Sequence, residues 1–389
     1  SYEHAHDFCD VLVIGSGPAG IAAALEAGSK NLNVILIEQD SIIGGNNLSK
    51  KNFESEDINN QLKINGVRVM TRTTAFGVYD NTVVGAFERV TDHVAQPSEK
   101  LPRQRFWTIR ARHIILASGA LERHVAFNNN DIPGIMTVNA SRQYLNRYGV
   151  LTGKNIVIAT NNDSVYETAK ELYEAGSKIT ILDSRKKINI DLPKGINHHL
   201  NTLPFNINGR KKIDSLDVCQ SSDLNNKNTI ICDQVLISGG WSPIVNLVSH
   251  RGVKPIWNVD NQCFVPGDIK ENITVVGSAK GIWSTEQCVQ SGFVGANEAM
   301  NKLGIHKKEI SFPSVGGWSN SIKPLFEVKS NKFPSKSFVD FQHDVTADDV
   351  RLAHREGFIS VEHLKRYTTL GMANDQGKMG NIIGLSLMA

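Results

Sequence analysis

The sequence lacks every cysteine pattern that builds a metal or redox centre. Its five cysteines are scattered through 389 residues without any C-x-x-C pair, which argues against a zinc knuckle, an iron–sulfur cluster or a redox disulfide built within this chain. No apolar run approaches the ~18 residues of a membrane-spanning helix, and the N-terminus lacks the charged-then-apolar pattern of a secretion signal. We therefore expect a soluble, cytoplasmic protein that neither enters a membrane nor holds a metal.

Strong charge of either sign is also missing. Lysine and arginine total 42 against 39 aspartates and glutamates, for a net charge of +3. The short basic pairs Lys186-Lys187 and Lys211-Lys212 are typical of solvated loops, so nucleic acid is not expected as a partner. His4 and His6 form an H-x-H pair, but no carboxylate or cysteine is placed to complete a ligand set, and we interpret them as part of a polar surface lead-in.

The stretch V-L-V-I-G-S-G-P-A-G, from Val11 to Gly20, carries the clearest functional signal. Four aliphatic residues predict a buried parallel strand, Gly15 allows a sharp turn, and a small-residue helix begins at Pro18. Gly17 lets a pyrophosphate approach the backbone, while Gly20 lets the helix pack closely on the strand. The helix N-terminus then offers unpaired N–H groups and a positive dipole end to the phosphates.

An acid completes the motif at the end of the next predicted strand, Val34–Ile37. Glu38 follows the glycines by about 20 residues, the spacing of the carboxylate that holds ribose hydroxyls. Such a carboxylate favours NAD or FAD and repels a 2′-phosphate. The Gly44-Gly45 pair is either a second glycine turn under the same ligand or an ordinary loop, and the sequence leaves both open.

Further strands are expected at Phe76–Arg89 and Arg105–Arg112, as an antiparallel meander laid over the first sheet. They lead into the apolar strand Ile114–Leu116, which ends in the small residues Ala117, Ser118 and Gly119, where the chain passes close to a cofactor. A late strand, Ile273–Gly277, followed by Ser278, is expected to return to the first sheet before a helix from about Thr285 to Leu303.

A second strand–turn–helix–strand unit begins at Asn155, but its turn, Thr160–Ser164, contains no glycine. Polar side chains there fill the room that a pyrophosphate needs, so we expect a domain that keeps the fold with a weak or empty nucleotide site. The predicted domains are 1–150 with 256–305, an inserted domain 151–255, and a linker and tail 306–389. The length also exceeds the ~250 to 300 residues of a single core.

The order of these elements resembles the two-dinucleotide-binding flavoproteins of the glutathione reductase type. This resemblance implies an α/β fold class, with two Rossmann-like three-layer domains (the FAD/NAD(P)-binding fold), the second inserted in the first, and a C-terminal helical tail. Three stretches are similar to the α subunit of heterotetrameric sarcosine oxidase: R-T-T-A-F-G-V-Y-D from Arg72, N-R-Y-G-V from Asn146 with T-N-N-D-S from Thr160, and the long segment from Phe338 to Lys378.

The resemblance implies an oxidoreductase subunit acting on CH-NH groups. In that family the α subunit binds NAD, and a β subunit carries FAD, where sarcosine is oxidised, and a covalent FMN near the α/β boundary; γ and δ subunits complete the complex. The products are glycine, hydrogen peroxide and formaldehyde, or 5,10-methylenetetrahydrofolate when tetrahydrofolate captures the methylene group. The family's N-terminal small domain and C-terminal folate domain are absent here. Because the chain also starts without methionine and ends in an apolar segment, we expect it to be cut at both ends.

We expect no catalytic residue in this chain, which should be inactive alone. The predicted cofactor-binding residues are Gly15, Ser16, Gly17, Pro18, Ala19, Gly20, Glu38, Gln39, Gly44, Gly45, Thr74, Ala117, Ser118, Gly119, Gly277 and Ser278. Ser278 stands where a flavin-binding reductase has an aspartate, which favours NAD and leaves FAD as the alternative at the same site. The competing functions are an α subunit of a proline, hydroxyproline or opine dehydrogenase, a standalone FAD- and NAD(P)H-dependent reductase, and a scaffold with structural NAD.

Overall fold

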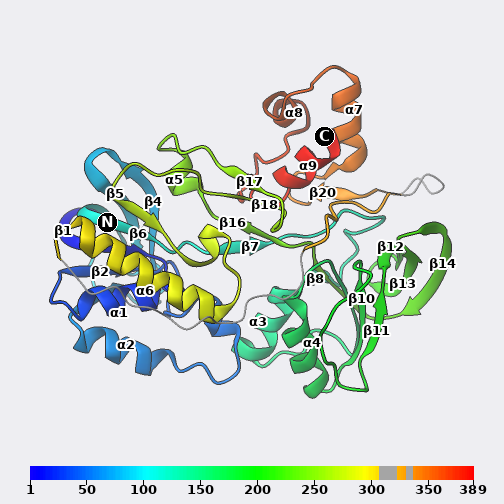
Figure 1. Ribbon diagram of the computed structural model, residues 1–389, viewed down its shortest axis with the longest axis horizontal. Coiled ribbons are helices and arrows are strands. Elements are labelled where there is room, and N and C mark those ends of the chain that lie inside the picture. The colour runs from blue at the N-terminus through cyan, green and yellow to red at the C-terminus, as the bar shows by residue number, and fades with distance from the viewer. Residues whose placement is uncertain (306–321, 330–335) are drawn as a thin grey trace. The chain divides into compact units, whose positions relative to one another are not determined.

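The computed structural model describes residues 1–305, 322–329 and 336–389. Within these residues the chain forms two compact units, coloured mainly blue and yellow for the first and green and red for the second (Figure 1). The first unit comprises Ser1–Ala120, Pro243–Asn258 and the described part of Phe264–Trp318. The second comprises Leu121–Ser242, Val259–Cys263 and the described part of Ser319–Ala389. The first unit is therefore made of three separate stretches of the chain.

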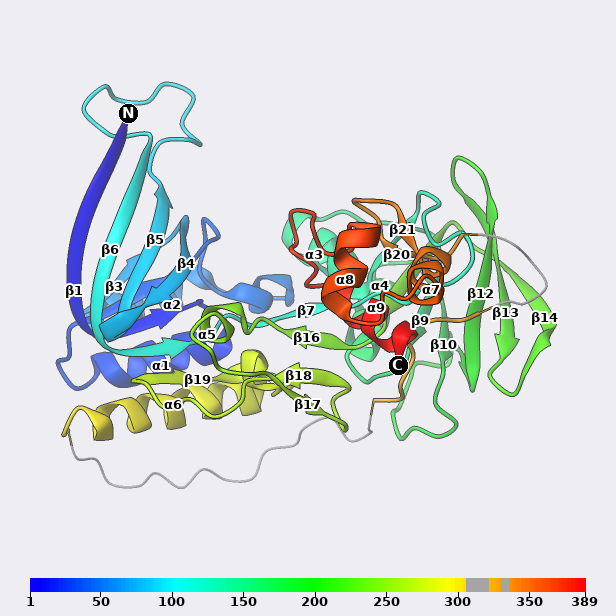
Figure 2. The same cartoon turned by 90° about the horizontal axis from the view of Figure 1, so that it is seen from above.

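The first unit is built on one mixed sheet with the order β3-β2-β1-β6-β5-β4, and β19 pairs with β6 beside it. Its strands are β1 (Tyr2–Ile14), β2 (Val34–Ile37), β3 (Val67–Met70), β4 (Thr73–Tyr79), β5 (Val83–Arg89), β6 (Gln104–Leu116) and β19 (Ile273–Val275). β1, β2, β3, β6 and β19 run parallel, whereas β4 and β5 add antiparallel pairs. Figure 2 shows the long strands β1 and β6 extending well beyond β2 and β3.

Two apolar layers cover the buried end of this sheet, because successive side chains of a strand point to opposite faces. Val11 and Val13 pack with α1 (Pro18–Gly28) and α6 (Thr285–Lys302), whereas Leu12 and Ile14 pack with residues of β4, β5 and the 243–258 segment. Small residues bring α1 and α6 close together, since a Cβ on Gly292 would lie 2.1 Å from the carbonyl oxygen of Ala19. The result is a three-layer arrangement around the first strand.

Several local predictions differ from the structure. The polar lead-in with His4 and His6 is in fact the first part of β1, paired in parallel with β6 from Tyr2 onward. The predicted strand 76–89 is a hairpin of β4 and β5, and the expected meander continues the first sheet instead of covering it. These polar residues form a strand because pairing with a neighbouring strand satisfies their backbone hydrogen bonds. One face of the strand is exposed, so the sequence shows no apolar run there.

The second unit contains a parallel sheet with the order β11-β10-β9-β15-β8 and an antiparallel sheet β12-β13-β14. The parallel strands are β8 (Ile135–Thr137), β9 (Asn155–Thr160), β10 (Lys178–Asp183), β11 (Asn197–Leu200) and β15 (Gln234–Ser238). The antiparallel strands are β12 (Thr202–Gly209), β13 (Ile213–Gln220) and β14 (Asp223–Ile231). One face of the parallel sheet packs on α3 (Val138–Tyr148) and α4 (Val165–Glu174), and the other on the antiparallel sheet.

The C-terminal part of the second unit is a small helical domain. It consists of β20 (Phe338–Asp340), β21 (Val345–Thr346), α7 (Ala347–Arg355), α8 (Val361–Thr368) and α9 (Asn381–Met388). The Thr346 side chain accepts a hydrogen bond from the Asp349 N–H, and the Asp349 side chain accepts one from the Thr346 N–H. This capping box fixes the start of α7. The Asn130 side chain donates to the Phe338 carbonyl and accepts from the Phe338 N–H, which ties β20 to the rest of the unit.

The unit boundaries lie at 120/121 and 242/243, which differs from the predicted 150/151 and 255/256. β8 pairs with β15, and Arg142 of α3 forms an ion pair with Glu171 of α4 at 2.6 Å, so residues 121–150 belong to the second unit. Residues 243–258 return to the first unit. The predicted linker from residue 306 lies largely outside the described residues.

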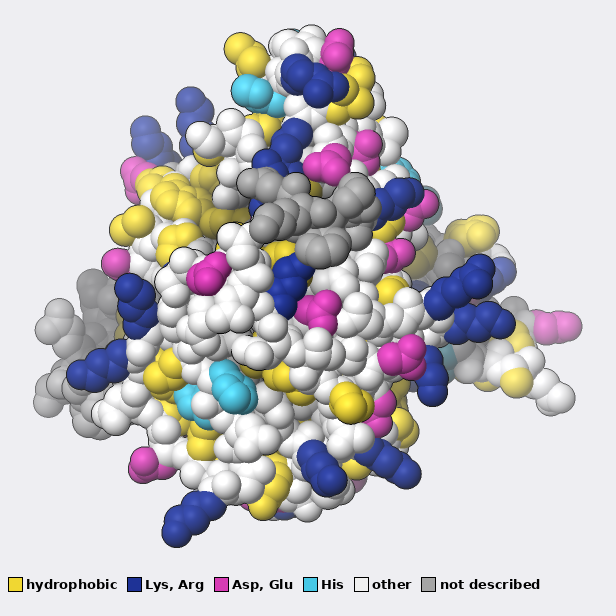
Figure 3. Space-filling model, turned by 90° about the vertical axis from the view of Figure 1, so that its right-hand side faces the viewer, with side chains coloured by type: hydrophobic (Ala, Val, Ile, Leu, Met, Phe, Trp, Pro, Cys, Tyr) yellow, Lys and Arg dark blue, Asp and Glu magenta, His cyan; other side chains and the backbone are white. Residues whose placement is uncertain are grey.

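The remaining short elements are η1 (Gly45–Ser49), α2 (Ser55–Ile64), η2 (Asp80–Thr82), β7 (Ala120–Glu122), β16 (Trp241–Pro243), α5 (Asn246–Ser249), β17 (Ile256–Asn258), β18 (Cys263–Val265) and η3 (Gly277–Lys280). Among the described residues, no helix combines the length and the apolar character that crossing a bilayer requires. On the face shown in Figure 3, basic side chains are interspersed with acidic ones, the pattern of a solvated surface.

Candidate functional site

The glycines of the β1–α1 turn have two distinct structural roles. Gly15 has φ +100°, and a Cβ on it would lie 2.4 Å from the Ala117 carbonyl oxygen. A Cβ on Gly20 would lie 1.8 Å from the Gly15 carbonyl oxygen. These two glycines are therefore required by the fold itself.

Gly17 is different, because a Cβ there would meet no protein atom within 4 Å. Its backbone is extended (φ −68°, ψ −179°), a conformation open to any residue, and Gly17 is the N-cap of α1 without a side-chain cap. Pro18 occupies the first helical position and Ala19 follows it, buried. The helix N-terminus thus faces open space on the side where Gly17 has no side chain, which is the geometry of a phosphate site.

Glu38 lies directly after β2 with 7% of its surface exposed. Its Oε2 accepts hydrogen bonds from the Ser16 N–H at 2.9 Å and the Ser16 hydroxyl at 2.5 Å, and its Oε1 accepts from the Asp40 N–H at 2.8 Å. The acid and the glycine turn are thus directly connected, as the motif predicts. Gln39 is exposed, and its carbonyl accepts from the Arg89 guanidinium at 2.8 Å.

The Gly44-Gly45 pair lies against the first glycine turn. The Gly44 N–H donates to the Ser16 carbonyl at 3.1 Å, and a Cβ on Gly45 would lie 2.8 Å from the Cα of Gly17. Both glycines have positive φ, +137° and +54°. The structure therefore brings the two glycine turns together.

The small residues at the end of β6 also reach this edge of the sheet. The Ala117 N–H donates to the Ile14 carbonyl at 2.8 Å, so Ala117 lies beside the end of β1. The Ser118 hydroxyl donates to the Ile244 carbonyl at 2.7 Å. Gly119 has φ +77° with no atom near its missing Cβ.

The late strand β19 ends at the same edge. Gly277 has φ +66°, and a Cβ on it would lie 2.7 Å from the Ala19 Cβ, next to the start of α1. The Ser278 hydroxyl lies 3.7 Å from the Cys288 thiol. Ser278 is uncharged, whereas the resemblance to flavin-binding reductases implies an aspartate at this position.

Among the predicted cofactor-binding residues, Thr74 comes from the antiparallel part of the sheet. It is exposed on β4, while its neighbour Thr73 is fully buried and donates its N–H to the Glu38 carbonyl at 2.8 Å. Because side chains alternate along a strand, the two threonines face opposite sides of the sheet. Sequence reasoning did not single out Thr73. Its contact with Glu38 is made by the backbone, and its hydroxyl donates to the Thr71 carbonyl at 2.9 Å, so the contact assigns no role to the Thr73 side chain.

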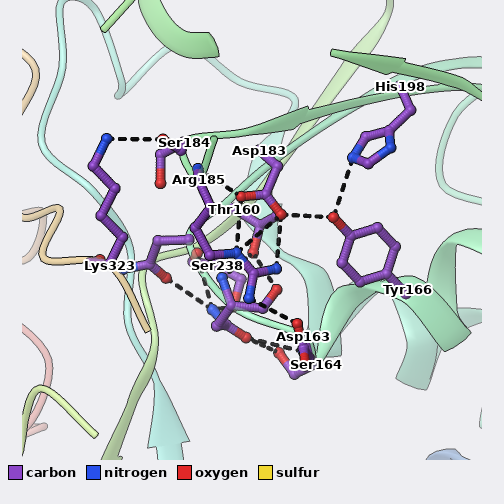
Figure 4. Close-up of polar contacts among 12 residues, drawn as sticks. Thr160, Asp163, Ser164, Tyr166, Asp183, Ser184, Arg185, His198, Ser238 and Lys323 are labelled. Atoms are coloured by element: carbon purple, nitrogen blue, oxygen red, sulfur yellow. Dashed lines mark hydrogen bonds and ion pairs between the residues drawn. The ribbon is translucent and has the colours of Figure 1, made fainter. Parts of the chain in front are cut away.

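The corresponding turn of the second unit is filled by its own side chains (Figure 4). The Asn162 amide donates to the Ser238 hydroxyl at 3.1 Å and accepts from the Ser164 N–H at 3.0 Å. Arg185 pairs with Asp163 and with Asp183, each at 2.7 Å, and all three side chains are at least nine-tenths buried. Burial by itself would lower the pKa of Arg185, but the hydrogen bonds and ion pairs with Asp183 and Asp163 together outweigh it, so the pKa is raised.

Residues 322–329, which precede the C-terminal domain in the sequence, also contact this turn. The Lys323 N–H donates to the Asn161 carbonyl at 3.2 Å, and the Asn161 amide donates back to the Lys323 carbonyl at 2.7 Å. The Lys323 ammonium donates to the Ser184 carbonyl at 2.8 Å, as Figure 4 shows. The loop therefore binds its own chain through the groups that would otherwise face a ligand.

The cysteines offer no redox centre in the structure. All five are free and buried, and burial raises the pKa of Cys9 to about 12 and that of Cys263 to about 11. Thiols in such surroundings are poor nucleophiles because the thiolate is the reactive form. Among the described residues, no cluster of three or more His, Cys, Asp or Glu side chains could hold a metal ion.

Two family models match this chain. Residues 9–292 match the family model described as pyridine nucleotide-disulphide oxidoreductase. The chain belongs to that oxidoreductase family. Residues 334–389 match the sarcosine oxidase A3 domain, which is the small C-terminal domain described above.

Two curated relatives align along the whole chain. The sarcosine oxidase α subunit of Rhizobium meliloti (strain 1021) is 38% identical and that of Corynebacterium sp. (strain U-96) is 32% identical, over all of this chain and 40% and 43% of their own lengths. The chain thus spans about two-fifths of the length of these relatives. Among solved structures, L-proline dehydrogenase from P. horikoshii aligns with a TM-score of 0.71 at 21% identity, over 99% of this chain and 74% of that one, which confirms the predicted fold class.

Proposed function

We propose that this chain is the NAD-binding portion of a sarcosine oxidase α subunit. It would belong to a complex that oxidatively demethylates sarcosine to glycine with oxygen, giving hydrogen peroxide and either formaldehyde or 5,10-methylenetetrahydrofolate. The proposal rests on the similarity to sarcosine oxidase α subunits, which extends over the whole of this chain. It includes the C-terminal A3 domain as well as the dinucleotide-binding unit.

The residues of the first unit fit one dinucleotide. Gly17 leaves room at an uncapped helix N-terminus, and Glu38 retains acceptor capacity beyond the three donors that it already receives. A helix N-terminus favours the negative charge of a pyrophosphate, whereas a carboxylate disfavours the additional phosphate of NADP. Ser278 is uncharged and stands where a flavin-binding reductase has an aspartate. NAD is therefore the proposed occupant and FAD the alternative.

The second unit is proposed to bind no tight nucleotide. Its turn has the buried Asp163–Arg185–Asp183 pairs and the Lys323 segment where a pyrophosphate would approach. A ligand could enter only after several buried hydrogen bonds were broken, and leaving buried polar groups unpaired is costly. Its role is to support the fold and the C-terminal domain.

The oxidation itself is assigned to a partner. FAD, where sarcosine is oxidised, and a covalent FMN would be carried by a β subunit, with γ and δ subunits completing the complex and the FMN at the interface with this chain. Flavins supply the electron-accepting chemistry, and the protein supplies binding and orientation. Tetrahydrofolate would be used through a further domain of the α subunit.

Anaerobic mixing of sarcosine with the purified chain tests this division of labour. The chain alone should bind NAD yet show no sarcosine-dependent flavin bleaching, and it should form no peroxide when oxygen is then admitted. Adding a flavin-loaded β subunit should restore anaerobic bleaching. Bleaching by the chain alone would show that it is a complete enzyme.

Proline dehydrogenation is the competing activity that the sequence leaves open, and one solved structure that shares this fold is named an L-proline dehydrogenase. Repeating the mixing experiment in the reconstituted complex with sarcosine and with L-proline separates the two. We expect bleaching with sarcosine, and faster bleaching with L-proline would assign the chain to the dehydrogenase instead.

A further inference from the structure

Ser16 is fully buried between the first two glycines of the turn, and its side chain forms hydrogen bonds with two other segments. Its hydroxyl donates to Glu38 Oε2 at 2.5 Å and accepts from the Gly44 N–H at 3.1 Å. It therefore connects the β1–α1 turn, the acid after β2 and the second glycine turn. The G-x-G-x-x-G motif itself places no requirement on this position.

The hydrogen bonds leave Glu38 in a defined orientation. Oε2 receives two donors from Ser16, the backbone N–H and the hydroxyl, while Oε1 receives the Asp40 N–H. An ionised carboxylate has about four acceptor sites, so capacity remains for a ligand. Hydrogen bonds to a charged acceptor are shorter and stronger than neutral ones, which restricts carboxylate rotation.

We propose that Ser16 is a positioning residue that holds the Glu38 carboxylate for the hydroxyls of the adenosine ribose. Through this contact Ser16 sets the preference for a ribose over a 2′-deoxyribose. The inference rests on the proposed NAD site and adds a determinant of sugar recognition that does not itself face the ligand.

The Ser16→Ala variant removes only the hydroxyl contacts. The Gly44 N–H keeps a second acceptor in the Ser16 carbonyl at 3.1 Å, and the Ser16 N–H continues to donate to Glu38. The turn therefore has the hydrogen bonds that it needs to fold. The carboxylate, however, loses one of the two donors to Oε2 and can rotate more freely.

The test measures calorimetric affinities of the purified chain for NAD⁺ and for its analogue with 2′-deoxyadenosine. Wild type should prefer NAD⁺. Ser16→Ala should lose about 10- to 150-fold in affinity for NAD⁺, the effect of one hydrogen bond to a charged group, while its affinity for the deoxy analogue changes less than about twofold. The hydroxyl-bearing Ser16→Thr should retain the preference.

Two further variants complete the design. Ser141→Ala removes another fully buried hydroxyl, which is bonded to Thr152 at 2.7 Å in the second unit, and should leave both affinities unchanged. Glu38→Gln should itself reduce the preference, and adding Ser16→Ala to it should then have little further effect, because the two residues act as one unit.

The outcomes separate the inference from the function on which it rests. Equal losses for both ligands in Ser16→Ala would show a merely structural hydroxyl, and an unchanged preference would show that Glu38 needs no positioning; either result overturns the inference alone. If wild type binds neither ligand, the proposed NAD site is overturned as well.

Discussion

Replacing Arg185 by methionine tests whether the second unit keeps its turn for stability or for a ligand. The guanidinium pairs with Asp163 and Asp183, and the three side chains are 5%, 7% and 0% exposed. Methionine keeps most of the volume but leaves two carboxylates buried without their cation. Removing one partner from a buried ion pair typically costs about 3–5 kcal/mol.

The assay is urea unfolding combined with hydrogen exchange of β9 and β10, with β2 of the first unit as an internal reference. Arg366→Met is the matched control, because Arg366 pairs with Glu362 on the surface, where both side chains are more than 70% exposed. Such a helical surface pair contributes about 0.3–0.5 kcal/mol. We expect exchange to accelerate in β9 and β10 of Arg185→Met only, and Asp163→Asn in the same chain should recover part of the loss.

The reasoning would be refuted if Arg185→Met cost no more than the surface control. It would also be refuted if the variant kept its stability but lost one equivalent of bound NAD, since the network would then be a ligand site.

Three further predictions concern the glycine turn, the acid and pH. Glu38→Ala should weaken NAD binding by about 1–3 kcal/mol in calorimetry through loss of a charged acceptor, and unchanged binding would remove Glu38 from the site. Gly20→Ala should lower the unfolding temperature of the ligand-free chain, because its Cβ would lie 1.8 Å from the Gly15 carbonyl oxygen; an unchanged melt would contradict this close packing. Burial raises the pKa of Glu122 from 4.5 to about 7, so folding favours its protonated form and stability falls as pH rises from 4.5 through 7, by about 3 kcal/mol in all. Glu122→Gln should therefore gain stability over wild type between pH 5 and pH 8 in thermal melts, and a constant difference would show that Glu122 does not titrate in this range.

The parts of the fold with strong local signals could be predicted from the sequence. The aliphatic run before Gly15 became the buried end of β1, and the helix predicted from about Thr285 to Leu303 matches α6 closely. The link between the glycine turn and Glu38 follows from the fixed geometry of a strand–helix–strand unit. In each case the residues that decide the structure lie within about one supersecondary unit.

The features that escaped prediction depend on partners far along the chain. The first ten residues become a strand because Tyr2 pairs with Gln104, and residues 121–150 join the second unit because Ile135 pairs with Val235. The side chain of Arg185 is neutralised by Asp163, a residue from the preceding turn. Sequence periodicity reports which face of an element is apolar and does not identify the partner of that face.

We propose that this chain binds one NAD molecule, at the turn that contains Gly17. Gly17→Val is the most direct probe, because the extended backbone before Pro18 accepts a β-branched residue and its Cβ would meet no protein atom within 4 Å. Calorimetric titration should find one NAD per wild-type chain and none in Gly17→Val, with the unfolding temperature of the ligand-free chain unchanged. Two equal sites in wild type, or stoichiometric NAD in Gly17→Val, would contradict the account.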